Sequence, residues 1–363
     1  MTSLAEKLAP ESIKKLIPYQ SARRIGGNGR LWLNANELEQ PLLFKAHQTA
    51  LNRYPDFLPQ DIASAYQAYC NTSQPTIAVR GADEAIDLVI RTFCQPGKDR
   101  IVTCSPTYAM YQFCAESFSI ETIDCPLNPN DFSLNVEQII SASHQANVIF
   151  LCSPNNPTGQ ILGREKIISI LEQTANQSLV VVDEAYIEFE LAESVVDLID
   201  QYPHLIVIRT LSKAFGLAAL RCGFIIASSS VMKFIARLIP PYPMPDSSSE
   251  IVLHALSSEG LQSVASHTQS LIETREEFIR AIEHLEWIDT VYPSATNFVL
   301  IRTQPNVNLF EYLIEHGVVT RNQAHEPALK NCVRITIGSA QTMHEVSEII
   351  CNFSGVLTPS TVR

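Results

Sequence analysis

The stretch RTLSKAFGLAALR, residues 209–221, decides the fold and the chemistry that this chain can support. Four apolar residues, 205–208, run directly into it, which predicts a buried strand that delivers Lys213 to a strand end. A lysine that is partly desolvated beside other cations has a lowered pKa and can form a Schiff base. Arg209 and Arg221 are the neighbouring cations that the sequence offers. The alternative interpretation is a surface lysine in a serine-rich turn.

The residues on both sides of this lysine favour the chemical interpretation. Thr210 and Ser212 provide hydroxyl groups, and Arg221 provides a two-pronged guanidinium. Together these groups predict a cup for a phosphate dianion. A lysine beside a phosphate cup is what pyridoxal 5'-phosphate requires, so we expect this cofactor at Lys213.

The composition limits the classes of protein that fit. A chain of 363 residues suits one large domain with a smaller one. The formal net charge of −12 and the scattered Lys and Arg residues argue against nucleic acid as a partner. The nine cysteines form no CxxC pair, which predicts reduced thiols and no metal site. Without a signal peptide or an apolar run of membrane length, we expect a soluble cytoplasmic protein.

From residue 76 onward, short apolar runs alternate with amphipathic stretches. This rhythm is typical of an α/β fold with a mostly parallel sheet flanked by helices, whose ligands bind at the carboxyl ends of the strands. The predicted strands are 76–80, 100–104, 119–124, 147–151, 179–183, 205–209 and 223–227. The predicted helices between and after them are 82–93, 107–117, 134–143, 163–174, 193–200 and 229–239.

A proline-rich stretch predicts the boundary between two domains. Residues 240–245 contain four prolines, which cannot continue a helix. We therefore expect a large domain over 36–240 and a smaller α+β domain over 241–363, with an N-terminal arm, 1–35, that joins the small domain. In the small domain we expect helices at 247–257, 259–285 and 340–352 and strands at 297–301 and 332–337.

Several polar motifs fall where strands of the large domain should end. Ala82 and Asp83 open a helix after a glycine, so their N–H groups face an anion while the Asp83 carboxylate caps the helix; an ordinary glycine turn is the alternative. Tyr108 either stacks on an aromatic ring or belongs to the core. The NANE stretch, 34–37, presents its amides to a ligand or forms a polar turn.

Two further strand ends carry groups suited to a pyridine ring. Asn156 offers an amide donor to a phenolate-like oxygen. Asp183 ends a fully apolar run, where an ionised carboxylate needs a partner. A protonated pyridine nitrogen is one such partner and keeps the ring an electron sink, and a buried arginine is the other.

With these motifs in place, the chain resembles the fold type I pyridoxal-phosphate aminotransferases, and within them the branch that acts on L-histidinol phosphate. Ala219 stands where that family usually has glycine, and Leu38-Glu39 replaces a common Asn-Pro. The resemblance is nearly end to end and is carried by the motifs at 18–20, 52–55, 80–84, 106–108, 153–159, 183–186, 209–221, 242–243 and 333–336.

The resemblance implies a role for each motif. It implies that Lys213 holds the cofactor and then moves a proton, that Asp183 contacts the pyridine nitrogen, and that Asn156 and Tyr186 contact the ring oxygen. It also implies a homodimer in which Tyr54 reaches the phosphate of the neighbouring subunit's cofactor.

The same resemblance implies the substrates. Histidinol phosphate and glutamate, with 2-oxoglutarate as keto partner, both carry an anionic terminus, for which Arg334, Arg321 and Tyr19 are the expected contacts. From the residues alone, Arg321 cannot be preferred over Arg302. A related pyridoxal enzyme, such as an aromatic aminotransferase or a phospho-amino-acid lyase, and a catalytically silent binding protein remain as alternatives.

Overall fold

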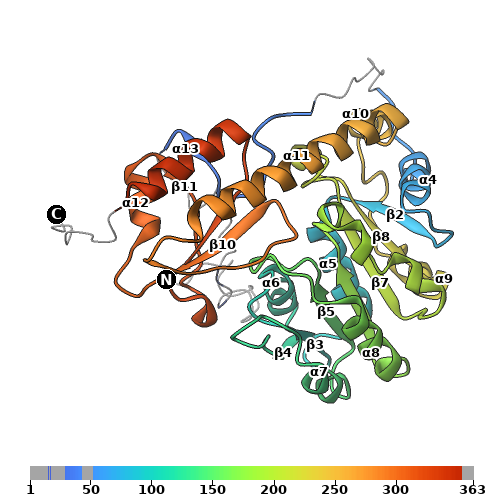
Figure 1. Ribbon diagram of the computed structural model, residues 1–363. Coiled ribbons are helices and arrows are strands. Elements are labelled where there is room, and N and C mark those ends of the chain that lie inside the picture. The colour runs from blue at the N-terminus through green and yellow to red at the C-terminus, as the bar shows by residue number, and fades with distance from the viewer. Residues whose placement is uncertain (1–14, 16, 18–28, 43–51, 354–363) are drawn as a thin grey trace, which may run out of the picture.

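The computed structural model describes residues 15, 17, 29–42 and 52–353, and its largest element is a seven-stranded sheet (Figure 1). The strands lie in the order β2-β8-β7-β6-β5-β3-β4. All neighbouring pairs are parallel except those that involve β8, which runs antiparallel to β2 and β7. The strands are β2 (Thr76–Val79), β3 (Arg100–Thr103), β4 (Glu121–Asp124), β5 (Val148–Cys152), β6 (Leu179–Asp183), β7 (Leu205–Thr210) and β8 (Gly223–Ala227). The mostly parallel α/β sheet predicted from the sequence is therefore confirmed.

The central strands are apolar because both faces of the sheet are covered. Side chains alternate between the faces, so Val180 and Val182 join one core cluster while Val181 joins the other. Helices α5 (Ala82–Phe93), α6 (Met110–Ser117) and α9 (Ser229–Ile235) pack in the cluster of Val181. Helices α4 (Gln60–Tyr69), α7 (Val136–Ser143) and α8 (Arg164–Thr174) pack in the other cluster.

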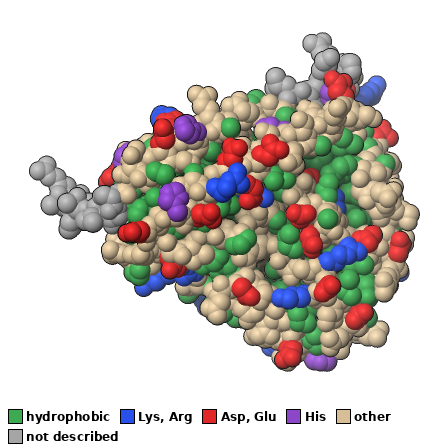
Figure 2. Space-filling model, in the orientation of Figure 1, with side chains coloured by type: hydrophobic (Ala, Val, Ile, Leu, Met, Phe, Trp, Pro, Cys, Tyr) green, Lys and Arg blue, Asp and Glu red, His purple; other side chains and the backbone are tan. Residues whose placement is uncertain are grey.

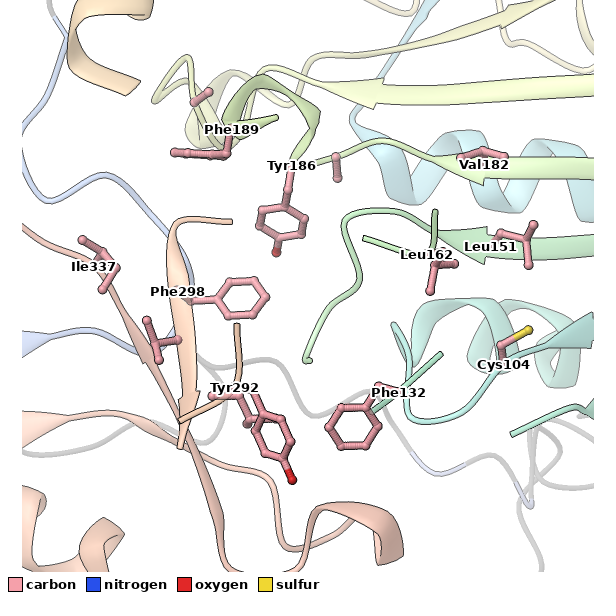
Figure 3. Packing of buried hydrophobic residues seen from close by; sticks show 14 of the residues in the cluster. Cys104, Phe132, Leu151, Leu162, Val182, Tyr186, Phe189, Tyr292, Phe298 and Ile337 are labelled. Carbon is pink, nitrogen blue, oxygen red and sulfur yellow. The ribbon is translucent and has the colours of Figure 1, made fainter. Parts of the chain in front are cut away.

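A four-stranded antiparallel sheet of order β12-β13-β10-β9 follows in the C-terminal part. The core cluster of Val182 continues without a break into this part, where Phe298 and Ile337 contribute to it (Figure 3). Its elements are α10 (Asp246–Ala255), α11 (Ser258–Ile282), β9 (Ile288–Val291), β10 (Phe298–Thr303), α12 (Leu309–Glu315), β11 (Val318–Val319), β12 (Arg321–Asn322), β13 (Cys332–Thr336) and α13 (Ala340–Cys351).

The beginning of the described chain lies on this second unit. Strand β1 (Leu31–Trp32) pairs in parallel with β11, and the backbone N–H of Thr336 donates to the carbonyl oxygen of Leu33. Segments separated by nearly the whole sequence are thus side by side.

The predicted helix over 193–200 is wrong. Only the short 3-10 turn η3 (Val196–Asp200) lies within this range, and η1 (Ile187–Phe189) and η2 (Leu191–Glu193) come before it. The buried carboxylate of Glu184 accepts hydrogen bonds from the Val195 N–H at 2.7 Å and from the Ser194 hydroxyl at 3.1 Å. These bonds hold residues 194 and 195 on the carboxylate that follows β6. Two further turns are η4 (Ala218–Leu220) and η5 (Pro327–Leu329).

Glu184 also forms a buried ion pair with Arg209, and their closest atoms are Oε2 and Nε at 2.8 Å. Their side chains are only 1% and 3% exposed. The Arg209 Nη2 group donates to the Ser194 hydroxyl at 2.7 Å, so the pair ties β7 to the turns after β6.

Within the described ranges, no helix combines the length and apolar character needed to cross a bilayer.

We expect Glu184→Gln to lower the free energy of unfolding by about 3–5 kcal/mol, because it leaves the Arg209 charge buried without a counterion. Urea denaturation followed by circular dichroism measures this change. The matched control is Glu121→Gln, which breaks the exposed Arg100–Glu121 pair of similar length, 2.7 Å, and should cost less than about 1 kcal/mol. If both variants lose the same free energy of unfolding, burial does not determine what it costs to break an ion pair here.

Candidate active site

The turn after β7 holds Lys213 in a partly buried position near the carboxyl ends of the central strands. Its Nζ lies 3.4 Å from the carbonyl oxygen of Ala35 and 5.6 Å from the centre of the Tyr186 ring. Burial, and next the guanidinium of Arg334, lower the pKa of the Lys213 ammonium to about 8. The predicted lowering of this pKa by nearby cations is thus found, but Arg209 is not among them because it is paired with Glu184.

The residues expected to form a phosphate cup lie around the start of α5. The hydroxyl of Thr210 donates to that of Ser212 at 2.9 Å, and the Arg221 guanidinium lies 3.3 Å from the Asp83 carboxylate. Gly81 has φ of +85°, and a Cβ there would lie 2.6 Å from Nη2 of Arg221. Only glycine therefore leaves room for the guanidinium beside the helix start.

The predicted helix cap by Asp83 is wrong. Its carboxylate accepts a hydrogen bond from the Tyr108 hydroxyl at 2.8 Å and contacts Arg221. The carboxylate of Glu84 instead reaches back to the backbone N–H of Arg80 at 2.6 Å. Asp83 thereby holds Tyr108 and Arg221 on the same side of the helix start.

Asp183 ends β6 and is only 2% exposed. Its Oδ2 accepts from the Tyr111 hydroxyl at 2.8 Å and its Oδ1 from the Ala185 N–H at 3.1 Å. Burial raises the pKa of the Asp183 carboxyl to about 6, against the opposing effect of these two bonds. Among the described residues, no Lys, Arg or His forms an ion pair with it, so the alternative of a buried arginine partner is wrong.

Tyr111 was not foreseen as part of the site. It lies on α6, is fully buried, and stacks on Phe150 of β5 with ring centres 4.9 Å apart. In the helix predicted over 107–117, its spacing of three residues from Tyr108 places both on one face, which was the signal available in the sequence, although α6 itself begins only at Met110.

On the opposite side, Arg334 of β13 reaches the large sheet. Its Nη1 donates to Oδ1 of Asn156 at 2.5 Å and its Nη2 to the carbonyl oxygen of Asn34 at 3.1 Å. Tyr186 is buried, packs edge-on against Phe298 with ring centres 5.3 Å apart (Figure 3), and accepts a hydrogen bond from the Asn36 amide at 2.9 Å. The segment that was expected to face a ligand or form a polar turn thus contacts several groups of the site.

The strand register decides between the two candidate arginines. Arg321 of β12 lies directly opposite Arg334 of β13, so both belong to the same position in the sheet. Arg302 is held elsewhere, because it donates to the Tyr292 hydroxyl and to the carbonyl oxygen of Ala328, both at 2.8 Å. The geometry therefore favours Arg321.

One predicted residue, Tyr54, is not part of this cluster. It is 82% exposed and stacks on Tyr242 with ring centres 4.7 Å apart. Tyr19, also predicted, lies outside the described residues. No group of His, Cys, Asp and Glu within the described residues could hold a metal ion.

The donor set fits an anionic aromatic cofactor. Hydroxyls, a guanidinium and the N–H groups at the start of α5 surround one end, and these bind a phosphate group well. The carboxyl of Asp183, which has no cationic partner among the described residues, lies at the end of β6. The Lys213 amine, whose pKa is lowered, lies beside the phenol of Tyr186. This arrangement suits a phosphorylated pyridine ring that carries a carbonyl group.

Comparison with known proteins agrees with this geometry. A sequence model of the family described as aminotransferase class I and II matches residues 31–350. The chain is 42% identical to a histidinol-phosphate aminotransferase of Haemophilus influenzae, over 94% of this chain and 97% of that protein. It is 40% identical to the enzyme of the same name from Shigella flexneri, over 94% and 96% of the two chains.

Solved structures show the same fold. The histidinol-phosphate aminotransferase of Clostridium acetobutylicum superimposes with a TM-score of 0.79 at 22% identity, covering 88% of this chain and 98% of that one. That of Sinorhizobium meliloti, solved in complex with pyridoxal-5'-phosphate, gives a TM-score of 0.79 at 19% identity and covers 95% and 98%.

Asp183 yields a prediction about stability without cofactor. Its carboxyl has a raised pKa in the folded protein, so the folded state favours the protonated form and loses stability as the pH rises from about 4 to about 6. We expect Asp183→Asn to raise the free energy of unfolding of the cofactor-free protein at pH 8 by up to about 3 kcal/mol, and hardly at pH 4.

Urea denaturation of both proteins at the two pH values measures the difference. The exposed Asp289→Asn serves as a control and should give the same small difference at both pH values. A stabilisation by Asp183→Asn that does not depend on pH would show that the carboxylate is not penalised by burial.

Proposed function

The chain belongs to the class I and II aminotransferases, and from this premise we propose that it transfers an amino group between L-histidinol phosphate and 2-oxoglutarate, in histidine biosynthesis. The observation that carries the proposal is Lys213, whose amine has a pKa lowered by burial and by Arg334, with Asp83 and Arg221 at the start of α5 also acting on it. Relatives at 40–42% identity over 94% of the chain bear that name.

The proposed cofactor is pyridoxal 5'-phosphate, which supplies an electron sink that stabilises negative charge at the substrate's α-carbon. Lys213 would hold it covalently, and Tyr108 would lie against its ring. Its phosphate would be bound by Thr210, Ser212, Arg221 and the N–H groups of Ala82 and Asp83. Asp183 would face the pyridine nitrogen, and Asn156 and Tyr186 the ring oxygen.

Two side chains of this chain handle the proton. The Lys213 amine, with a pKa of about 8, is neutral in a useful fraction at physiological pH and can take the proton from the substrate's α-carbon. The Asp183 carboxylate, desolvated by burial, is stabilised when a cationic N–H lies opposite it, and it holds the proton there in return.

The anionic ends of both substrates would be bound by Arg334 and Arg321, with Tyr19. These ends are a phosphate in histidinol phosphate and a carboxylate in glutamate, and a guanidinium matches either with two parallel hydrogen bonds. In the structure the Arg334 guanidinium donates to Asn156 and to Asn34, so binding of a substrate would replace polar partners already aligned.

The proposed domain division is an arm, 1–35, a large domain, 36–240, and a small domain, 241–363. In support, the seven-stranded sheet lies within the second range and the four-stranded sheet within the third. The pairing of β1 with β11 agrees with an arm that joins the small domain.

We also propose a cytoplasmic location, which the nine unpaired cysteines support. On the face seen in Figure 2, Lys and Arg side chains are scattered among Asp and Glu, in line with small-molecule substrates.

We propose a homodimer with shared sites, in which Tyr54 contacts the cofactor phosphate of the neighbouring subunit. The exposed aromatic side chains of Tyr54, Phe57 and Tyr242 form one group on the surface. Exposed aromatic groups of this kind are typical of protein interfaces.

The first test of this function is a comparison of substrates. With 2-oxoglutarate as acceptor, we expect histidinol phosphate to give a kcat/KM at least about tenfold above that of phenylalanine, because a phosphate dianion offers Arg334 and Arg321 more charge and more acceptor oxygens than the single carboxylate of phenylalanine. Arg334→Lys should lower kcat/KM for histidinol phosphate and glutamate, while borohydride still fixes the cofactor on Lys213. Arg302→Lys is the matched control and should change neither value. A preference for phenylalanine would identify an aromatic aminotransferase instead.

A second test concerns the shared sites and requires that Tyr54→Ala alone be nearly inactive. When Tyr54→Ala and Lys213→Ala chains are mixed and exchange subunits, a hybrid with Tyr54 acting across the interface contains one site with both residues native. We therefore expect the mixture to regain activity that neither variant has. If activity stays absent after exchange has been verified, Tyr54 serves its own subunit.

A further inference from the structure

Three consecutive residues between β1 and the large sheet each contact a different group of the candidate site. The carbonyl oxygen of Asn34 accepts from Arg334 at 3.1 Å, and that of Ala35 accepts from Lys213 at 3.4 Å. The side-chain amide of Asn36 donates to the Tyr186 hydroxyl at 2.9 Å. Only the last of these contacts depends on a side chain of the segment, so it can be removed by substitution.

The backbone of Asn36 is fixed by the small sheet. Asn36 is 1% exposed and has φ of +55°, a left-handed conformation that asparagine and glycine tolerate best. Its N–H donates to the Thr336 hydroxyl at 3.0 Å, and its carbonyl oxygen accepts from the Asn297 amide at 3.0 Å. Residues of β13 and of the turn before β10 thus hold the position of Asn36 relative to Tyr186.

The hydrogen bonds also fix which way the Asn36 amide points. Because the Thr336 oxygen accepts from the Asn36 N–H, its own proton is available for Oδ1 of Asn36, which lies 3.1 Å away. Oδ1 therefore faces Thr336, and the NH₂ group faces Tyr186. A flipped amide would take away the acceptor of the Thr336 hydroxyl proton.

This polarity determines the direction of the Tyr186 proton. The Tyr186 oxygen accepts from an NH₂ group that has no lone pair to offer, so its own O–H must point elsewhere. Burial raises the pKa of this phenol, so it stays protonated at neutral pH. Of the groups whose charge affects it, Arg334 is a donor only, and the two Asp183 oxygens already accept from Tyr111 and Ala185. The third, the Cys152 thiol, contacts the carbonyl oxygen of Pro154. The proton is left for an acceptor on a bound ligand.

We propose that Asn36 is a positioning residue, which orients the hydroxyl of Tyr186 so that its proton is donated to the oxygen of the bound cofactor ring. The inference rests on the proposed function, because it assigns that oxygen as the acceptor. It makes Thr336, on the small-domain sheet, the residue that sets the polarity of a hydrogen bond in the large domain.

The experiment is a pH titration of the visible absorption of the cofactor-loaded enzyme without substrate. Donation by Tyr186 stabilises negative charge on the ring oxygen, so loss of orientation raises the midpoint of the titration. We expect both Asn36→Gly, which keeps the left-handed backbone, and Thr336→Val to raise this midpoint by about half a pH unit. Both changes are uncharged, so the fields of Arg334, Arg221, Asp83 and Glu37 around Lys213 stay the same.

Two controls separate positioning from a general structural role. Thr342→Val removes a hydroxyl that anchors the same segment through Glu39, 2.6 Å away, and should leave the midpoint unchanged. In a Tyr186→Phe background, Asn36→Gly should cause no further shift, because the group through which it acts is gone. An equal shift in both backgrounds, or an unchanged midpoint in Asn36→Gly, would overturn the proposal. A wild-type protein that binds no pyridoxal phosphate would instead overturn the proposed function beneath it.

Discussion

The common direction of the strands in the large sheet is the constraint on which the rest of the structure depends. Strands β2, β3, β5, β6 and β7 all end at the same edge, and each delivers one part of the site there. The strands are apolar on both faces, so the first polar residues after them lie at the border of a dry core. Asp183 and Lys213 both stand at this border, and burial shifts the pKa of each toward neutrality, upward for the acid and downward for the amine.

Much of this arrangement could be predicted from the sequence because it depends on local patterns. The alternation of apolar runs and amphipathic stretches gave the strands of the large sheet, and the position of Lys213 and Asp183 after such runs gave the centre of the site. The roles of Asp83 and Arg209 were predicted wrongly, because each is set by a partner distant in sequence, Tyr108 for Asp83 and Glu184 for Arg209. A side chain with several possible partners has no signature of its own in the sequence.

The small sheet shows the same limit more strongly. The pairing of Arg321 with Arg334 depends on the register of two strands joined by an irregular connection, and no periodic pattern reports that register. Strand β9 and helix α12 were also absent from the sequence prediction. Strand β9 carries Asp289 and Thr290 among its four residues, so no apolar run marks it. The position of Arg321 beside Arg334 therefore needed the structure, while the placement of Asp183 and Lys213 at strand ends could be predicted from the apolar runs before them.

The contact between Asn36 and Thr336 joins residues that lie 300 positions apart. During synthesis, all seven strands of the large sheet, within 76–227, leave the ribosome before Thr336 is made. The large sheet can therefore form first, while the contacts between segment 34–36 and β13 are still missing. These contacts form when β13 pairs with β10 and the N–H of Thr336 donates to the carbonyl oxygen of Leu33 in segment 33–36. A chain truncated before β13 can therefore contain the folded large sheet and still lack the contacts that hold segment 34–36 beside Lys213 and Tyr186.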